Sequence, residues 1–271
     1  MVSRRTTRLL AAGVLAAAVA LWLGRARRAP VPATDLSAEE EAAWSRTVAA
    51  LQQVAEEYPE TLELKDPDAS RRRRAQLAGF LGETSRLLAR TSSAPELPRQ
   101  VEALGKRVLG TDYRVGTDSR ALIDRIVERA QLRRTPRLKP DLANGRRVLA
   151  EACAPCHGSD GSDAPPAITA ALDPPPPNIL HPPHNLTPYE MFNRVTYGGV
   201  GTAMPSFEQG LTEAERWDVV FYLFAERWWP CEKPLPPIGA DELALMGDFE
   251  LGNKFGYGAA ACLRRDFLPP R

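Results

Sequence analysis

The sequence predicts an all-α protein in which a helical bundle is followed by a second helical domain and a proline-rich tail. Two observations carry this prediction: apolar residues recur at helical spacing, and helix-start signals precede these stretches. We expect the bundle at residues 34–138, the second domain at 139–229 and the tail at 230–271. The segment Pro136–Asp141 is interpreted as the boundary between the two domains.

Residues 1–33 are interpreted as a targeting segment. They hold six arginines and no acidic residue, and the arginines flank the apolar run Leu9–Leu23. Such a segment is typical of an export signal, which is either cleaved or kept as a membrane anchor. We therefore expect the protein in the periplasm or on the outer face of the cytoplasmic membrane, tethered or soluble. The remaining chain has 29 basic and 34 acidic residues (−5), and it lacks the basic patch of a nucleic-acid-binding protein.

Four helices are expected in the N-terminal bundle. The first follows the capping box Ser37–Glu40 and is expected to end at Tyr58-Pro59, because proline has no backbone N–H to donate. The others are expected at about Asp68–Arg90, at about Glu96–Leu109, and from Thr117 or Asp118 onwards. This region contains no histidine and no cysteine, so no redox chemistry is assigned to it.

The run Arg71–Arg74 is the densest cluster of charge in the predicted bundle. We interpret it as a solvated helix face. Binding of an anionic lipid or of an acidic partner is the alternative.

The residues that carry chemistry form the string Cys153-Ala-Pro-Cys156-His157. Each of the two thiols can add to one vinyl group of haem, and the adjacent imidazole can then ligate the iron. This pentad is the attachment motif of c-type haem. Cys-x-x-Cys also occurs in redox dithiols and zinc sites, but the chain has no second Cys-x-x-Cys and no thioredoxin-like context. We therefore predict one covalently bound haem c held by Cys153, Cys156 and His157.

The stretches around this motif agree with the prediction. A helix is expected at Asp141–Ala152. A histidine ligand needs an acceptor for its second ring nitrogen, and the proline run that follows the motif offers the carbonyl of Pro177. Capping boxes at Thr187 and Thr212 predict two more helices, and the second of these is rich in aromatic residues.

The order of these features resembles a class I c-type cytochrome domain, over roughly residues 141–229. The quoted features are a helix, Cys-x-x-Cys-His, a proline loop, a short helix, a loop with Met204-Pro205, and an aromatic helix. The resemblance implies a class I cytochrome c-like fold in which the sulfur of Met204 is the distal axial ligand. It also implies a crossing of the terminal helices, with Gly145 and Val148 packed against Val219 and Tyr222.

Several other residues compete for roles near the haem. His181 and His184 lie in a proline-rich loop, and either could replace Met204 in a bis-histidine haem. Met191 is expected in the core, whereas Met246 lies in the tail. Tyr197 is a candidate for the haem pocket, where it or Arg194 could contact a propionate.

A second, longer resemblance is to the extracytoplasmic part of bacterial iron permeases fused to cytochrome c. It rests on Tyr58-Pro59 in a helical region, on Leu-Asp-Pro-Pro-Pro at 172–176, and on Gly-Thr-Ala-Met-Pro-Ser-Phe at 201–207. It implies a link to ferrous-iron oxidation or iron uptake. The chain has no further apolar span and no Arg-Glu-x-x-Glu motif, so we expect no transport by the chain itself.

With both axial positions filled, the expected activity is outer-sphere transfer of single electrons. The expected partners are redox proteins, such as a membrane complex or an iron permease, and the membrane itself if the N-terminal segment is retained. A ferrous-iron oxidising component and a haem-containing sensor or partner-binding subunit are the alternatives. In an oxidising compartment Cys231 and Cys262 could form a disulfide, and the alternative is two buried free thiols.

Overall fold

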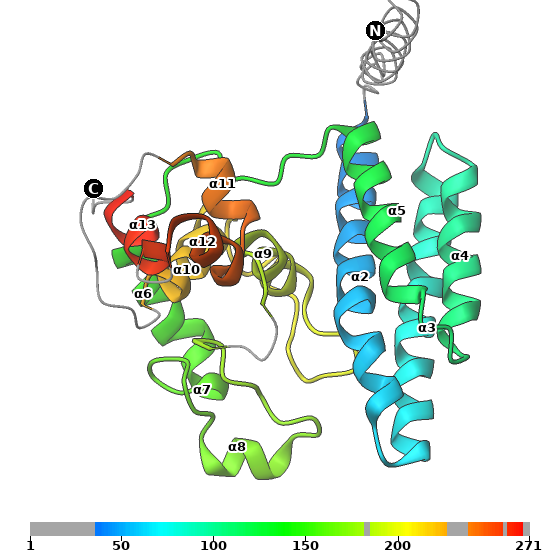
Figure 1. Cartoon of the computed structure of the whole chain (residues 1–271), viewed down its shortest axis with the longest axis horizontal. Coiled ribbons are helices and arrows are strands. Elements are labelled where there is room, and N and C mark those ends of the chain that lie inside the picture. The colour runs from blue at the N-terminus through cyan, green and yellow to red at the C-terminus, as the bar shows by residue number, and fades with distance from the viewer. Residues whose placement is uncertain (1–35, 182–184, 227–237, 257–258, 268–271) are drawn as a thin grey trace, which may run out of the picture.

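The computed structural model describes residues 36–181, 185–226, 238–256 and 259–267 (Figure 1). The predicted targeting segment at residues 1–33 lies outside these ranges. Every regular element within them is a helix, which confirms the all-α prediction. In the same ranges, no helix is both long and apolar enough to cross a lipid bilayer.

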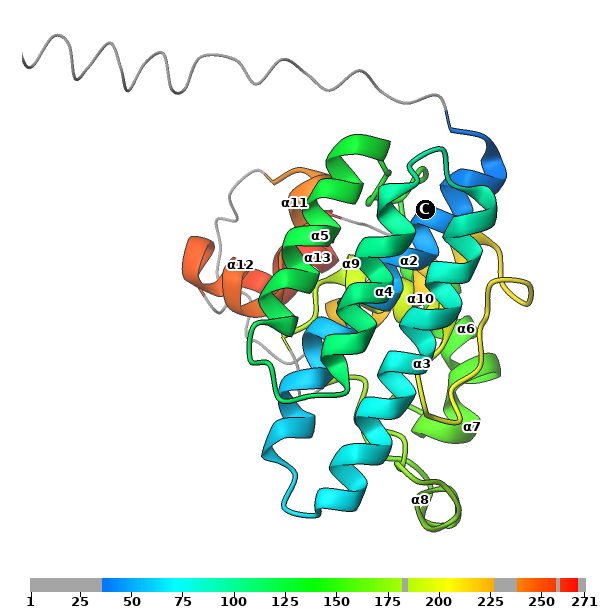
Figure 2. The same ribbon diagram turned by 90° about the vertical axis from the view of Figure 1, so that its right-hand side faces the viewer.

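Four helices form the bundle, and they lie side by side in two views of the molecule (Figures 1 and 2). They are α2 (Ala38–Glu63), α3 (Pro67–Thr91), α4 (Glu96–Val108) and α5 (Val115–Ala130). Their apolar faces meet in a core in which Leu51, Leu81 and Val101 have no exposed surface. The predicted positions of α3 and α4 are confirmed to within about two residues, which is the usual precision of helix boundaries.

The predicted end of the first helix at Tyr58-Pro59 was wrong. Helix α2 continues to Glu63 with Pro59 inside it. Proline leaves the carbonyl of Ala55, four residues earlier, without its helical donor. The guanidinium of Arg120 on α5 donates to that carbonyl at 3.4 Å, so a neighbouring helix replaces the lost hydrogen bond.

The second part of the chain is built from shorter helices around the Cys-x-x-Cys-His motif (Figure 1). In order they are α6 (Leu142–Val148), the π-helical turn η1 (Leu149–Cys153), α7 (Ala154–His157), α8 (Pro166–Ala171), α9 (Pro188–Tyr197) and α10 (Glu213–Ala225). The capping boxes predicted at Thr187 and Thr212 are both present and begin α9 and α10. Helix α8 was not predicted.

Helices α6 and α10 cross at the contact that the cytochrome resemblance implies. A Cβ atom at Gly145 would lie 2.2 Å from the carbonyl oxygen of Asp218 and 2.7 Å from the Cβ of Tyr222, so only glycine fits. Val148 and Val219 are buried in the same small cluster. The carboxylate of Asp218 also accepts hydrogen bonds from the backbone N–H of Asp141 and the side chain of Asn144, which fixes the start of α6.

The predicted proline-rich tail contains three helices that were not predicted from the sequence. They are α11 (Ala240–Leu245), α12 (Asp248–Phe255) and α13 (Ala260–Phe267). They fold because Leu243, Leu251 and Leu263 reach the main core. Fully buried Arg264 pairs with Asp248, and its guanidinium lies 4.4 Å from the ring centre of Phe224 on α10.

One buried core joins the bundle to the second part of the chain. The cluster that contains Leu51 and Leu81 also contains Tyr189 of α9 and Trp217 of α10. The rings of Trp217 and Phe192 stack with their centres 4.2 Å apart. The predicted domain boundaries therefore stay a prediction, because the core is continuous across them.

Candidate functional site

The Cys-x-x-Cys-His motif lies where the π-helical turn η1 meets α7. Cys153 ends η1, while Cys156 and His157 belong to α7. A π-helical turn widens the helix by one residue and is common at functional sites. Cys153 is half-buried, Cys156 is exposed, and both carry free thiols. The three side chains therefore come from one short helical segment, as the motif predicts.

His157 is held in one orientation by the proline run. Its ring is buried, and its Nδ1 atom lies 3.1 Å from the carbonyl oxygen of Pro177. A carbonyl oxygen can only accept, so Nδ1 carries the proton and Nε2 keeps its lone pair. Burial lowers the pKa of His157, against the opposing effect of this hydrogen bond, and favours the neutral ring that ligates metals. The predicted contact between His157 and Pro177 is confirmed.

The thiol of Cys153 does not have the acidity of a reactive thiol in a redox dithiol. Burial, with a smaller effect of neighbouring Cys156, raises the pKa of Cys153 from 9.0 to about 11. Catalytic Cys-x-x-Cys pairs instead contain a thiol with a lowered pKa, because the thiolate is the nucleophile. The geometry and the pKa of Cys153 thus favour attachment of a cofactor over thiol–disulfide exchange.

Met204 lies in a tight loop after α9. The backbone N–H of Gly199 donates to the carbonyl of Met204 at 3.3 Å, and the N–H of Met204 donates to the hydroxyl of Thr202 at 3.2 Å. Gly198 has a φ of +81°, and a Cβ there would lie 2.8 Å from the Met204 carbonyl oxygen. Met204 is half-buried and packs against a cluster that contains Met191 and Phe224.

Residues 140–223 match the protein family described as cytochrome c oxidase, cbb3-type, subunit III. This part of the chain is a c-type cytochrome domain. Its cofactor is covalently bound haem c, and its chemistry is electron transfer. No curated protein and no solved structure matches the chain. The longer resemblance to iron permeases therefore stays a prediction.

The residues of the cytochrome domain fit this cofactor. Two free thiols stand beside an imidazole whose Nε2 keeps its lone pair, which is the donor set that attaches haem c and ligates its iron from one side. A thioether sulfur is available from Met204 in a separate loop.

Four other residues compete with Met204 as the second ligand of the iron. Met191 is buried in the core, as predicted, and partly buried Met246 packs against the main core. His181 is exposed, while His184 lies outside the described residues. The alternative of a bis-histidine haem stays a prediction.

The two candidate propionate contacts both face the bundle. The guanidinium of Arg46 on α2 lies 5.4 Å from the ring centre of Tyr197, and burial raises the pKa of this tyrosine. Arg194 forms ion pairs with Glu56 and Glu57 of α2. The charge of Arg194 is therefore paired with carboxylates of the bundle. The role of Tyr197 in the haem pocket stays a prediction.

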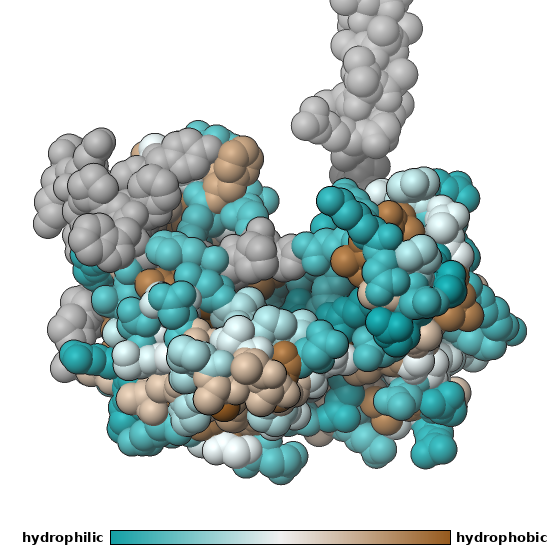
Figure 3. All heavy atoms as spheres, turned by 90° about the horizontal axis from the view of Figure 1, so that it is seen from below, coloured by the Kyte–Doolittle hydropathy of each residue, from teal (hydrophilic) through white to brown (hydrophobic). Residues whose placement is uncertain are grey.

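Apolar surface lies next to the haem-attachment motif. Helix α8 follows α7 along the chain and lies close to it in both ribbon views (Figures 1 and 2). Helix α8 has no buried residue, and Ala167, Ala170 and Ala171 are exposed. The view from below shows apolar side chains gathered on this face (Figure 3).

One set of residues around the Met204 loop was not predicted from the sequence. Gln53 of α2 and Arg73 of α3 both bond to the backbone of that loop. A signal was present for the first, because Gln52-Gln53 and Glu56-Glu57 repeat at a spacing of four within an otherwise apolar stretch. Arg73 was hidden in the four-arginine run, which was interpreted as a solvated face.

Proposed function

We propose that the protein carries single electrons through one haem c attached by Cys153 and Cys156, with His157 and Met204 as its axial ligands. The observation that carries this proposal is the orientation of His157. Its Nδ1–H is held by the carbonyl of Pro177, which leaves Nε2 for the iron, while two free thiols stand beside it.

When bound, haem c supplies an iron that alternates between the ferric and ferrous states. Cys153 and Cys156 would hold the porphyrin covalently, each through a thioether bond made by its sulfur. The hydrogen bond from His157 to Pro177 raises the basicity of the imidazole. The thioether of Met204 would favour the ferrous state, and an iron held by both His157 and Met204 would transfer electrons rather than bind a substrate.

The partner is a redox protein, and the cytochrome acts as a membrane-associated subunit outside the cytoplasm. The apolar surface of α8, beside the attachment motif, supports docking of that partner near the haem edge (Figure 3). Export is supported by the charge pattern of residues 1–33. A disulfide between Cys231 and Cys262 fits an oxidising compartment; Cys262 is fully buried, and Cys231 lies outside the described residues.

Substitution of Met204 by alanine tests the ligand assignment. The variant should keep its covalent haem, because the attachment residues are untouched. Its ferric spectrum should lose the far-red sulfur-to-iron band, its ferrous form should change from no CO binding to stoichiometric binding, and its reduction potential should fall. Met246→Ala is the matched control, since Met246 packs against the main core and not against the cluster that Met204 contacts. Unchanged spectra in Met204→Ala would refute the His/Met proposal.

The same preparation separates electron transfer from the alternative of ferrous-iron oxidation, which the longer sequence resemblance suggests. An electron carrier should exchange one electron per haem with any donor of suitable potential. Saturable, repeated turnover with ferrous iron and oxygen would instead identify an iron-oxidising component.

A further inference from the structure

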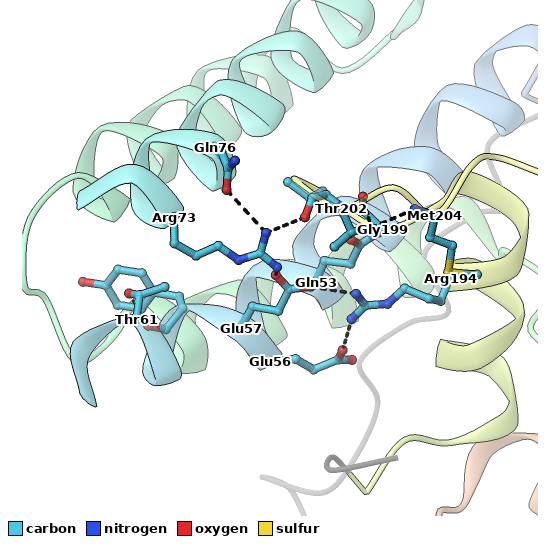
Figure 4. Close-up of polar contacts among 12 residues, drawn as sticks. Gln53, Glu56, Glu57, Thr61, Arg73, Gln76, Arg194, Gly199, Thr202 and Met204 are labelled. Atoms are coloured by element: carbon cyan, nitrogen blue, oxygen red, sulfur yellow. Dashed lines mark hydrogen bonds and ion pairs between the residues drawn. The ribbon is translucent and has the colours of Figure 1, made fainter. Parts of the chain in front are cut away.

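The loop that carries Met204 lies against the bundle, where it contacts both α2 and α3 (Figure 4). Gly201, at its tip, faces α3: a Cβ atom at this position would lie 2.5 Å from Gln76 Oε1 and 2.6 Å from Arg73 Nη1. Gly201 also has a φ of +62°, a conformation that favours glycine. The loop is thus shaped to approach α3 closely.

Gln53 of α2 bonds to this loop through both ends of its amide. Its Nε2 donates to the carbonyl of Gly198 at 3.0 Å, and its Oε1 accepts from the backbone N–H of Val200 at 2.8 Å. The Gln53 residue is 3% exposed. A buried side chain that satisfies both a donor and an acceptor of one loop fixes that loop in place, because opening it would leave polar groups unpaired.

Arg73 of α3 bonds to the next group of the same loop. Its Nη1 donates to the carbonyl of Val200 at 2.7 Å. Its Nη2 pairs with Glu57 of α2, whose other carboxylate oxygen accepts from Arg194 of α9 at 2.6 Å. Figure 4 shows this chain of contacts, which ties α2, α3, α9 and the loop together.

The neighbours of Arg73 behave differently. The side chains of Arg71 and Arg72 are 65% and 69% exposed and pair with aspartates at the start of α3. The Arg73 side chain is 21% exposed. Within the arginine run, therefore, Arg73 is the one whose described contacts reach the Met204 loop.

We propose that Gln53 and Arg73 are positioning residues, by which the helical bundle holds the Met204 loop closed and thereby keeps the distal ligand on the haem iron. This inference rests on the proposed role of Met204. It assigns the bundle, which contains no haem motif of its own, a part in setting the ligation and potential of the cytochrome.

The test uses the haem-loaded full chain with Gln53→Leu and, as a milder change at a half-exposed site, Arg73→Gln. Each variant should raise the equilibrium fraction of open loop about tenfold, as expected when a buried hydrogen-bond partner is lost. In hydrogen exchange, the backbone amide of Val200 should exchange about tenfold faster in Gln53→Leu. CO should bind the ferrous variants measurably, and their reduction potentials should fall.

Two control variants separate this role from a general contribution to folding. Gln52→Leu removes the buried hydrogen bond between Gln52 and Asn193 of α9. This bond lies at the same surface of α2 as Gln53, but it does not involve the Met204 loop. Arg72→Gln changes an exposed member of the arginine run. Both controls should keep the wild-type CO response and potential, even where Gln52→Leu lowers stability.

The outcomes distinguish the two proposals. If Met204→Ala changes the spectra as expected but Gln53→Leu and Arg73→Gln bind CO like the wild type, the positioning role is refuted. It is equally refuted if Gln52→Leu has the same effect as Gln53→Leu. If Met204→Ala leaves the spectra unchanged, the ligand assignment itself fails, whatever hydrogen exchange shows at Val200. Should Gln53→Leu fail to fold, Arg73→Gln decides the question.

Discussion

Glu56 on α2 faces the cytochrome domain, where it pairs with Arg194, and its pKa lies far from the ordinary value of a carboxyl group. Burial raises its pKa from 4.5 to about 7, although the nearby positive charge of Arg194 acts in the opposite direction. The folded state therefore holds this proton more tightly than the unfolded state does. By linkage, the stabilisation of the folded state by the protonated Glu56 carboxyl is complete below pH 4.5, and it is lost as the pH rises towards about 7.

Replacing Glu56 by glutamine should remove this pH-dependent loss. The free energy of unfolding of Glu56→Gln, relative to the wild type, should increase between about pH 5 and about pH 7, by an amount on the order of 1–3 kcal/mol. Urea unfolding at several pH values measures the difference. Glu83→Gln, an exposed site on α3, is the matched control and should run parallel to the wild type. A difference that shrinks as the pH rises would contradict the assigned direction of the pKa shift.

At the scale of residues, the sequence predicted the haem-attachment residues but not the residues that hold the Met204 loop. Cys153, Cys156 and His157 are adjacent in the chain, so a local motif reveals them. The partner of His157 was also predictable, because a ring nitrogen needs an acceptor and Pro177 follows nearby. Gln53 and Arg73 act on a loop more than a hundred residues away, and only the folded structure brings them together.

Among the elements, α6 and α10 approach each other so closely that their contact leaves no room for a side chain at Gly145. The hypothetical Cβ at Gly145 would meet backbone atoms of Asp218, which cannot move without shifting α10. We expect Gly145→Val to destabilise the cytochrome domain by at least about 3 kcal/mol, because the two helices must separate. Thermal unfolding should show a melting temperature lower by roughly 10 °C.

The control for this prediction lies two residues earlier in the same helix. Ala143 is exposed, so Ala143→Val carries the same β-branched side chain at the cost of helix propensity alone, roughly 0.5 kcal/mol. Equal losses in the two variants would show that propensity, and not the close approach of the helices, sets the cost at Gly145.

Helix starts were predicted better than helix ends. Thr187 and Thr212 begin α9 and α10 because their capping boxes are local devices that need no tertiary partner. Pro59 was interpreted as a helix end because its missing N–H is also a local property. Its consequence is not local, since Arg120 of another helix supplies the donor. The helices of residues 240–267 were missed for the same reason: their leucines are buried only against the rest of the molecule.

For the whole molecule, the continuous core indicates that the bundle and the cytochrome domain stabilise each other. Trp217 of α10 and Tyr189 of α9 are 3% and 6% exposed and share one apolar cluster with the bundle. The ion pairs of Arg194 with Glu56 and Glu57 join the same two parts. A free cytochrome domain would expose these aromatic rings to water, at a cost of about 1.5–3 kcal/mol for each large side chain.

We therefore expect the haem-loaded chain to unfold in a single cooperative transition. Far-ultraviolet circular dichroism follows the helices, of which the two longest, α2 and α3, lie in the bundle. The visible haem spectrum follows ligation in the cytochrome domain. The two curves should coincide in urea, which is the standard test of two-state behaviour.

Trp217→Ala weakens the surface that the bundle and the cytochrome domain share. It should lower the free energy of unfolding by about 3–5 kcal/mol and move both curves together to lower urea concentrations. Loss of helical signal at a urea concentration where the haem spectrum is still native would contradict the prediction. It would mean that the bundle can melt while Met204 remains on the iron, so this experiment also bears on whether the bundle holds the ligand loop.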